Sequence, residues 1–246
     1  MEGKFVVFHE PRKSMSVHEI IQSFFSDVVG KFNPYFFLLF SFIIFIASNI
    51  PYAFLLSFRH YSRPFSDDLP LPDLLYKMTQ DANFSSINTA VKVIHFFILC
   101  SSFICFILHQ RRLVIFQSFF IISSILIIFK MIIMIGTDVP DPSSKCYNYP
   151  SSPYSRSLGS ALKTLFSLDS CYNLMFSGFV SIVTLCTLYW THYFHPFVGL
   201  FYWLMTLAEA FLCVFARRNY TMDVIVAILL TLTTFEITHR WFEKLL

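Results

Sequence analysis

The sequence predicts an all-α polytopic membrane protein built as a bundle of six transmembrane helices. Of its 246 residues, 56% are apolar and only 13% are charged, whereas a soluble domain is about 25% charged. The apolar residues also gather in uncharged runs close to the length of about 20 residues that crosses a bilayer as a helix. An ordinary soluble globular domain is therefore excluded.

The six predicted spans are residues 34–57, 92–109, 113–136, 171–191, 197–216 and 222–239. Continuous apolar runs, such as residues 36–40 and 125–129, favour helices over the alternating strands of a membrane β-barrel. We therefore expect residues 34–246 to form one membrane domain.

Residues 1–33 are predicted to form a separate N-terminal segment. Charged residues, among them Lys4 and Glu10, precede any long apolar run, so no cleavable signal pattern is recognised. Apolar residues recur at spacings of three and four between Val17 and Val28. This pattern fits an amphipathic helix on the membrane surface, and it also fits a solvated tail with one packed face.

Six spans fix which loops share a side of the membrane. Residues 58–91, 137–170 and 217–221 must lie on one side, and residues 110–112 and 192–196 on the other, with both termini. Lys and Arg are almost equally divided between the two sides, so charge does not set the orientation.

Two sequence features favour a non-cytoplasmic position for the longer loops. Asn83 begins a glycosylation sequon, and Cys146 and Cys171 could pair in an oxidising compartment. An unused sequon and two buried thiols remain the alternatives.

Four polar motifs fall on the side shared by the longer loops. They are Pro70-Leu71-Pro72-Asp73, Lys130 with Pro140-Asp141-Pro142, Cys171 with Ser177-Gly178-Phe179, and Arg217-Arg218-Asn219-Tyr220-Thr221-Met222-Asp223-Val224. In order and spacing, over about residues 34–240, they resemble the sphingomyelin synthase family, a branch of the lipid phosphatase-like membrane enzymes. The resemblance implies transfer of a phosphocholine-type head group from a phospholipid to ceramide.

The chain departs from that family at the positions that carry the chemistry. Where the resemblance implies two catalytic histidines, this sequence has Phe179 and Asn219, while the family's Asp is retained as Asp223. An imidazole gains and loses a proton near neutral pH, which neither Phe nor Asn can do. Loss of the main members of a catalytic unit costs about 10⁴ to 10⁶ in rate, so the two-histidine mechanism is expected to be absent or strongly impaired.

Other histidines of the sequence are candidate replacements for the two that are missing. His192, His195 and His239 are expected at the opposite membrane face and cannot substitute. His95 and His60 lie on the correct side and could reach the site, although a histidine near a membrane interface is more often only an interfacial polar residue.

The remaining motif residues are candidate substrate ligands: Lys130, Arg217, Arg218, Ser177, Gly178 and Tyr220. Lys130 and Glu209 are predicted at similar depths, so Lys130 either forms an ion pair with Glu209 or faces a lipid phosphate. The two arginines either receive a phosphodiester or anchor a helix end at the head groups. Asn219 and Asp223, four residues apart, are expected on one helix face, and Glu236 is expected to pair with Arg240.

The sequence favours two functions. The first is a sphingomyelin synthase-like head-group transferase with an altered mechanism, and the second is an inactive, lipid-binding or regulatory relative. A transporter or channel is less favoured, because the intramembrane charges are few and no inverted repeat is apparent. We expect no metal and no other cofactor.

The expected partners are a phospholipid together with ceramide or diacylglycerol, and not nucleic acid. A second copy of the chain or an active relative is a further possible partner. The expected location is a Golgi, endoplasmic reticulum or plasma membrane.

Overall fold

The computed structural model describes residues 34–62, 73, 84–137 and 176–245. Every regular element within these segments is an α-helix, which confirms the all-α prediction. Five of the helices are long and apolar enough to cross a membrane. The protein is therefore an integral, multi-pass membrane protein.

The helices are α2 (Pro34–Ser62), α4 (Phe84–Leu108), α5 (Arg112–Gly136), α7 (Gly178–Tyr193), α8 (Pro196–Phe215) and α9 (Thr221–Leu245). Each overlaps one predicted span, in the predicted order. Helix α4 begins earlier than the predicted residue 92, because its first turns carry polar residues that hydropathy excluded. The prediction that the fourth span begins at residue 171 is wrong, since Phe176 and Ser177 are not helical and α7 begins at Gly178.

Some predictions concern residues outside the described segments: the amphipathic helix within residues 1–33, the sequon at Asn83, the Cys146–Cys171 pair, and the prolines at positions 70, 72, 140 and 142. They stay predictions.

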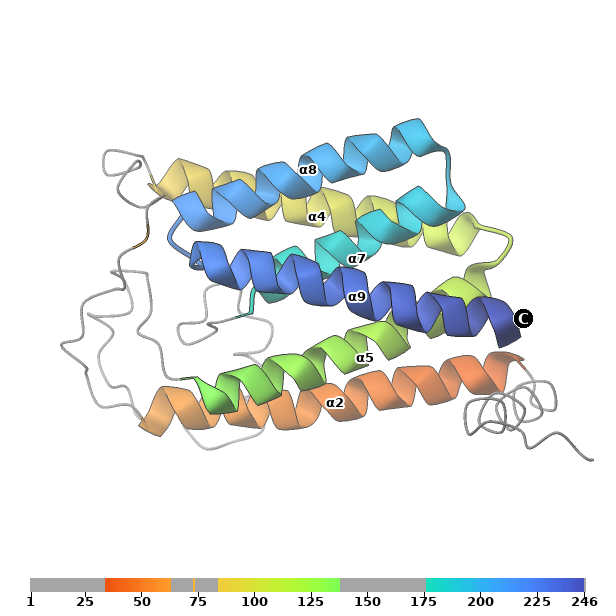
Figure 1. Ribbon diagram of the computed structural model, residues 1–246, viewed down its shortest axis with the longest axis horizontal. Coiled ribbons are helices and arrows are strands. Elements are labelled where there is room, and N and C mark those ends of the chain that lie inside the picture. Colours follow the sequence, from red (N-terminus) through yellow and green to blue (C-terminus); the bar gives the residue numbers. More distant parts are fainter. Residues whose placement is uncertain (1–33, 63–72, 74–83, 138–175, 246) are drawn as a thin grey trace, which may run out of the picture.

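Successive helices run in opposite directions along the bundle (Figure 1). The starts of α4, α7 and α9 therefore gather with the ends of α2, α5 and α8, as the helix count predicted. We refer to this end of the bundle, which holds Phe84, Gly136, Gly178 and Thr221, as the site end. The start of α7 lies further inside the bundle than the start of α9 (Figure 1).

Helix α7 lies at the centre and contacts α4, α5, α8 and α9. Its side chains Val180, Val183, Leu185 and Tyr189 are fully buried. Helix α2 lies at the edge, packs mainly on α5 and exposes large apolar side chains. An apolar outer surface of this kind suits contact with lipid chains.

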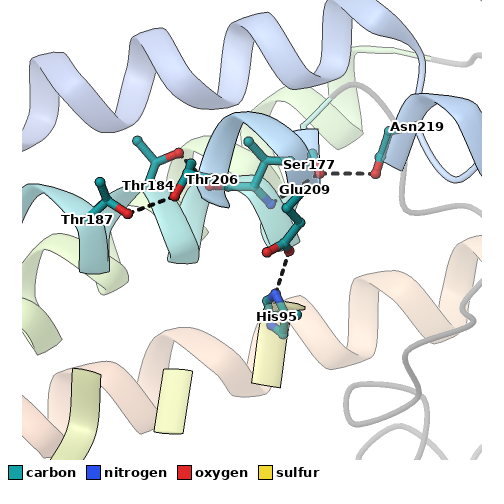
Figure 2. Close-up of polar contacts among 8 residues, drawn as sticks. His95, Ser177, Thr184, Thr187, Thr206, Glu209 and Asn219 are labelled. Carbon is teal, nitrogen blue, oxygen red and sulfur yellow. Dashed lines mark hydrogen bonds and ion pairs between the residues drawn. The ribbon is translucent and has the colours of Figure 1, made fainter. Parts of the chain in front are cut away.

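Hydroxyl groups join the central helices to each other. Thr187 of α7 and Thr206 of α8 share a hydrogen bond of 2.7 Å between their Oγ1 atoms (Figure 2). Ser181 of α7 and Thr231 of α9 share another of 2.8 Å. Such bonds contribute about 0.6 kcal/mol each in membrane bundles, so they hold α7 in register with two neighbours.

The end of the bundle opposite the site end holds His192, His195 and His239, as the number of spans predicted. The ring centroids of His192 and His239 lie 3.9 Å apart, and His195 caps the start of α8. Near this end, Arg240 Nε donates to Glu236 Oε2 at 3.3 Å, which confirms the predicted pair. Both of these side chains are exposed.

Candidate functional site

The start of α7 meets the turn that precedes α9. Ser177 is the N-cap of α7, and its Oγ accepts a hydrogen bond from the backbone N of Val180. The same hydroxyl donates to Oδ1 of Asn219 at 3.0 Å (Figure 2). The backbone N of Ser177 donates to the carbonyl oxygen of Asp223 at 3.3 Å. Two of the four sequence motifs are thus joined directly, as their resemblance to one site predicted.

A tight turn after α8 positions the two arginines. Arg217 has a φ of 52°; its N donates to the carbonyl of Val214, and the N of Arg218 donates to that of Cys213. This is the Schellman arrangement that ends many helices, and its left-handed position is usually a glycine. Arginine at that position is a strained choice, which occurs most often where function requires the side chain.

Helix α9 begins at Thr221, and Asp223 closes its first turn. Oδ2 of Asp223 accepts a hydrogen bond of 2.9 Å from the backbone N of Tyr220, as the third helical residue does in a capping box. Tyr220, Asn219 and Asp223 are all buried. The prediction that Asn219 and Asp223 share one helix face is wrong, because Asn219 lies in the turn before the helix.

Asp73, the last residue of the first motif, also reaches the start of α9. Its Oδ2 accepts from the backbone N of Thr221 at 2.8 Å, and both carboxylate oxygens lie 2.9 Å from the Thr221 hydroxyl. A carboxylate is favourable at this position because the first N–H groups of a helix lack intrahelical acceptors. Asp73 is therefore fixed to the fourth motif.

Lys130 of α5 points at the start of α7. Its side chain is only 6% exposed, and its Nζ lies 2.8 Å from the position that a Cβ on Gly178 would occupy. The ammonium also lies 5.0 Å from the ring centroid of Tyr52. Within the described part of the chain, no carboxylate forms an ion pair with Lys130.

The predicted alternative of a Lys130–Glu209 ion pair is wrong. Glu209 of α8 is fully buried, and its Oε1 lies 2.7 Å from Nδ1 of His95 on α4 (Figure 2). The depth of Glu209 and Lys130 in the membrane does not show which helices are neighbours. Helix α4 packs against α8, and this brings His95 to Glu209. The sequence signal for the His95–Glu209 pair was an ionisable residue within each of two apolar spans.

The ring of Phe179 contacts both an imidazole and a guanidinium. Its ring centroid is 4.8 Å from that of His95, and the guanidinium carbon of Arg218 is 5.0 Å from the same ring. A histidine therefore does reach the position where the resemblance implies a catalytic one. The side chain of His60, the other candidate, lies outside the described part.

The site end thus gathers Lys130, Arg217, Arg218 and the start of α7. A helix start carries about half a positive charge and presents free N–H groups, so it binds phosphate and carboxylate. Among the described residues, no three His, Cys, Asp or Glu side chains form a group able to hold a metal ion. The chemistry of the donor groups is that of an anion site.

Residues 170–240 match the family described as PAP2 superfamily C-terminal. The match covers α7, α8 and most of α9, together with the Ser-Gly and Asn-Tyr-Thr motifs. It supports a lipid phosphatase-like or phosphotransferase-like membrane protein. It does not reach Asp73, His95 or Lys130, whose place at the site comes from the structure.

Proposed function

We propose that the start of α7 binds the phosphate of a membrane lipid head group, in a sphingomyelin synthase-like protein of sphingolipid and phospholipid metabolism. The observation that carries this proposal is the buried ammonium of Lys130, packed against Gly178 at a helix start. A buried cation is costly inside a membrane protein and is retained where it meets a ligand or a partner, and no described carboxylate pairs with Lys130.

A phosphate would relieve that cost. It would accept hydrogen bonds from the first backbone N–H groups of α7 while it neutralised Lys130. Gly178 is suited to this position because a Cβ there would meet Nζ of Lys130. The lack of a side chain therefore lets the ammonium and the helix start share one anion.

The arginines extend the positive surface beyond the start of α7. Arg217 is held by the strained turn, and Arg218 lies over Phe179. One guanidinium group can bind two phosphate oxygens at once, so the site suits a phosphodiester that bears a lipid chain. The proposed ligands are a phospholipid and, as acceptor or product, ceramide or diacylglycerol, within an endomembrane or the plasma membrane.

A second candidate function is that of an inactive relative that binds lipid and regulates an active protein or a second copy of this chain. Phe179 and Asn219 favour it, because neither can replace an imidazole. The carbonyl oxygen of Asn219 is moreover engaged by the Ser177 hydroxyl. Both candidates share the phosphate site and differ only in turnover.

Lipid binding to the purified protein tests the shared proposal. Native mass spectrometry in detergent would compare a short-chain phosphatidylcholine with the matching diacylglycerol, which lacks the phosphate. Lys130→Met should weaken phosphatidylcholine binding at least tenfold and leave diacylglycerol binding unchanged. Arg240→Met removes an exposed cation at the opposite end and serves as the control. Equal phosphatidylcholine affinity in Lys130→Met and the natural protein would refute the proposal.

Head-group transfer from phosphatidylcholine to fluorescent ceramide separates the two candidates. The Phe179→His, Asn219→His double variant should transfer more than the natural chain, since it restores both imidazoles. Activity confined to the double variant would favour the inactive relative. Measurable turnover by the natural chain would favour the altered transferase.

A further inference from the structure

The buried pair of His95 and Glu209 lies beside the proposed phosphate site. His95 lies outside residues 170–240, the segment that matches a known family. We propose that His95, positioned by Glu209, is the proton-transfer group of this protein and takes over part of the role lost at Phe179. The inference rests on the proposed lipid-phosphate site and decides in favour of the altered transferase.

The first step of the argument is the orientation of the ring. Nδ1 of His95 lies 2.7 Å from Oε1 of Glu209, and the two side chains are 7% and 0% exposed. When the Glu209 carboxylate is ionised and the imidazole is neutral, Nδ1 carries the hydrogen and Nε2 keeps a free lone pair. A carboxylate on one ring nitrogen is also how catalytic histidines are held in the useful tautomer.

The second step is the place of the ring. The His95 imidazole contacts the ring of Phe179 at a centroid distance of 4.8 Å. Phe179 directly follows Gly178, whose missing Cβ leaves room for Nζ of Lys130. The His95 imidazole and the Lys130 ammonium thus lie beside two consecutive residues at the start of α7. Arg218, on the far side of the motif, lies over the same phenyl ring.

The third step is that stability alone is a poor reason for this pair. Burying an ion pair costs about as much as its attraction returns, and the neighbouring helix contacts use uncharged hydroxyls instead. Oε2 of Glu209 is buried and has no hydrogen-bond partner among the described residues. Ionisable residues within membrane helices most often mark a functional site.

The proposed step moves one phosphoryl-linked head group and one proton. The hydroxyl oxygen of the acceptor ceramide forms a bond to phosphorus while its proton passes to Nε2 of His95. The phosphorus–oxygen bond to the departing diacylglycerol breaks, and that oxygen takes the proton from Nε2. His95 ends unchanged, and Lys130 neutralises the phosphate oxygens throughout.

Head-group transfer by the natural chain in vesicles of phosphatidylcholine and fluorescent ceramide tests the proposal. General acid–base catalysis contributes about 10² to 10⁴ in rate, so His95→Gln should lower kcat at least a hundredfold with little change in KM. Glu209→Gln should lower kcat less, because the imidazole remains but is no longer held. His109→Gln, a histidine at the opposite end, is the matched control.

A rescue experiment separates catalysis from folding. Because the rings of residues 95 and 179 touch, Phe179→His in the His95→Gln background returns an imidazole to the same space and should recover at least tenfold of the lost kcat. A structural role for His95 predicts that Phe179→His changes kcat by the same factor in the natural chain and in the His95→Gln background. Failure of the rescue, or equal kcat in His95→Gln and the natural chain, would overturn the proposal.

Lipid binding distinguishes failure of this inference from failure of the site. If phosphatidylcholine binds through Lys130 but the natural chain transfers no head group, the catalytic role of His95 is refuted and the binding site stands. If Lys130→Met binds phosphatidylcholine as tightly as the natural chain, the site itself is refuted, and the inference with it.

Discussion

Asp73 and Thr221 lie 148 positions apart in the chain, and the carboxylate of one binds both the backbone N and the hydroxyl of the other. Asp73 therefore supplies a cap for the start of α9. Since Thr221 follows Arg218, Asn219 and Tyr220, the Asp73 carboxylate also fixes the turn that carries them.

Replacing Asp73 should therefore destabilise the site end. Asp73→Ala removes a helix cap with a charged acceptor and should lower the free energy of unfolding by about 1–2 kcal/mol. Thermal unfolding in detergent, followed by circular dichroism, measures the change. Thr221→Ser keeps both donors and should behave as the natural protein. An unchanged melting temperature in Asp73→Ala would show that the contact contributes nothing to stability.

Gly178 should tolerate no side chain in the ligand-binding state. A Cβ there would lie 2.8 Å from Nζ of Lys130, so Gly178→Ala should displace the ammonium and weaken phosphatidylcholine binding at least tenfold. The fold should survive, since Ala favours helices more than Gly does and a lysine end can move. Gly136→Ala is the control, because no atom of the described residues lies within 4 Å of its Cβ position. Equal lipid affinity in the two variants would contradict this account of Gly178.

Arg217 should show a conflict between stability and binding. Its φ of 52° costs about 1 kcal/mol or more for a residue with a Cβ, so Arg217→Gly should raise the melting temperature. The same change removes a guanidinium and should weaken phosphatidylcholine binding several-fold. Calorimetry and native mass spectrometry on one preparation measure both effects. If the variant is more stable and its lipid affinity is unchanged, Arg217 does not bind the phosphate and only anchors the helix end at the head groups.

Gly199 should be required for the packing of α8 on α7. A Cβ there would lie 3.0 Å from Cα of Thr191, and backbone cannot yield as a side chain can. Gly199→Ala should cost about 1–3 kcal/mol, the usual range for overpacking. The comparison of melting temperatures again uses Gly136→Ala as its reference. A melting temperature of Gly199→Ala that matched the reference would show that the two helices separate easily.

Local pattern predicted the fold well. Hydropathy found each helix of the described segments and their alternating directions, and the spacing of four identified the Glu236–Arg240 pair. Both follow from interactions within one helix or between a helix and lipid. The start of α7 was misplaced, because its N-cap depends on contacts of Ser177 with the distant Asn219 and Asp223.

The candidate site was predicted only in part. The sequence brought the motifs of Ser177 and Asn219 together, but it assigned Glu209 to Lys130 instead of His95. Helix count gives depth and side of the membrane, and it does not say which helices are neighbours. The partner of a buried charge depends on that neighbourhood, as does the contact between Asp73 and Thr221.

The hydroxyl and the amide of Ser177 are bound to Asn219 and Asp223, so two hydrogen bonds tie the start of α7 to the start of α9. Any tilt of the last helix in response to bilayer thickness or a docking protein would carry the Gly178 amide with it, relative to Lys130 on α5. The anion affinity of the proposed site would then depend on the tilt of α9, although the lysine lies on α5.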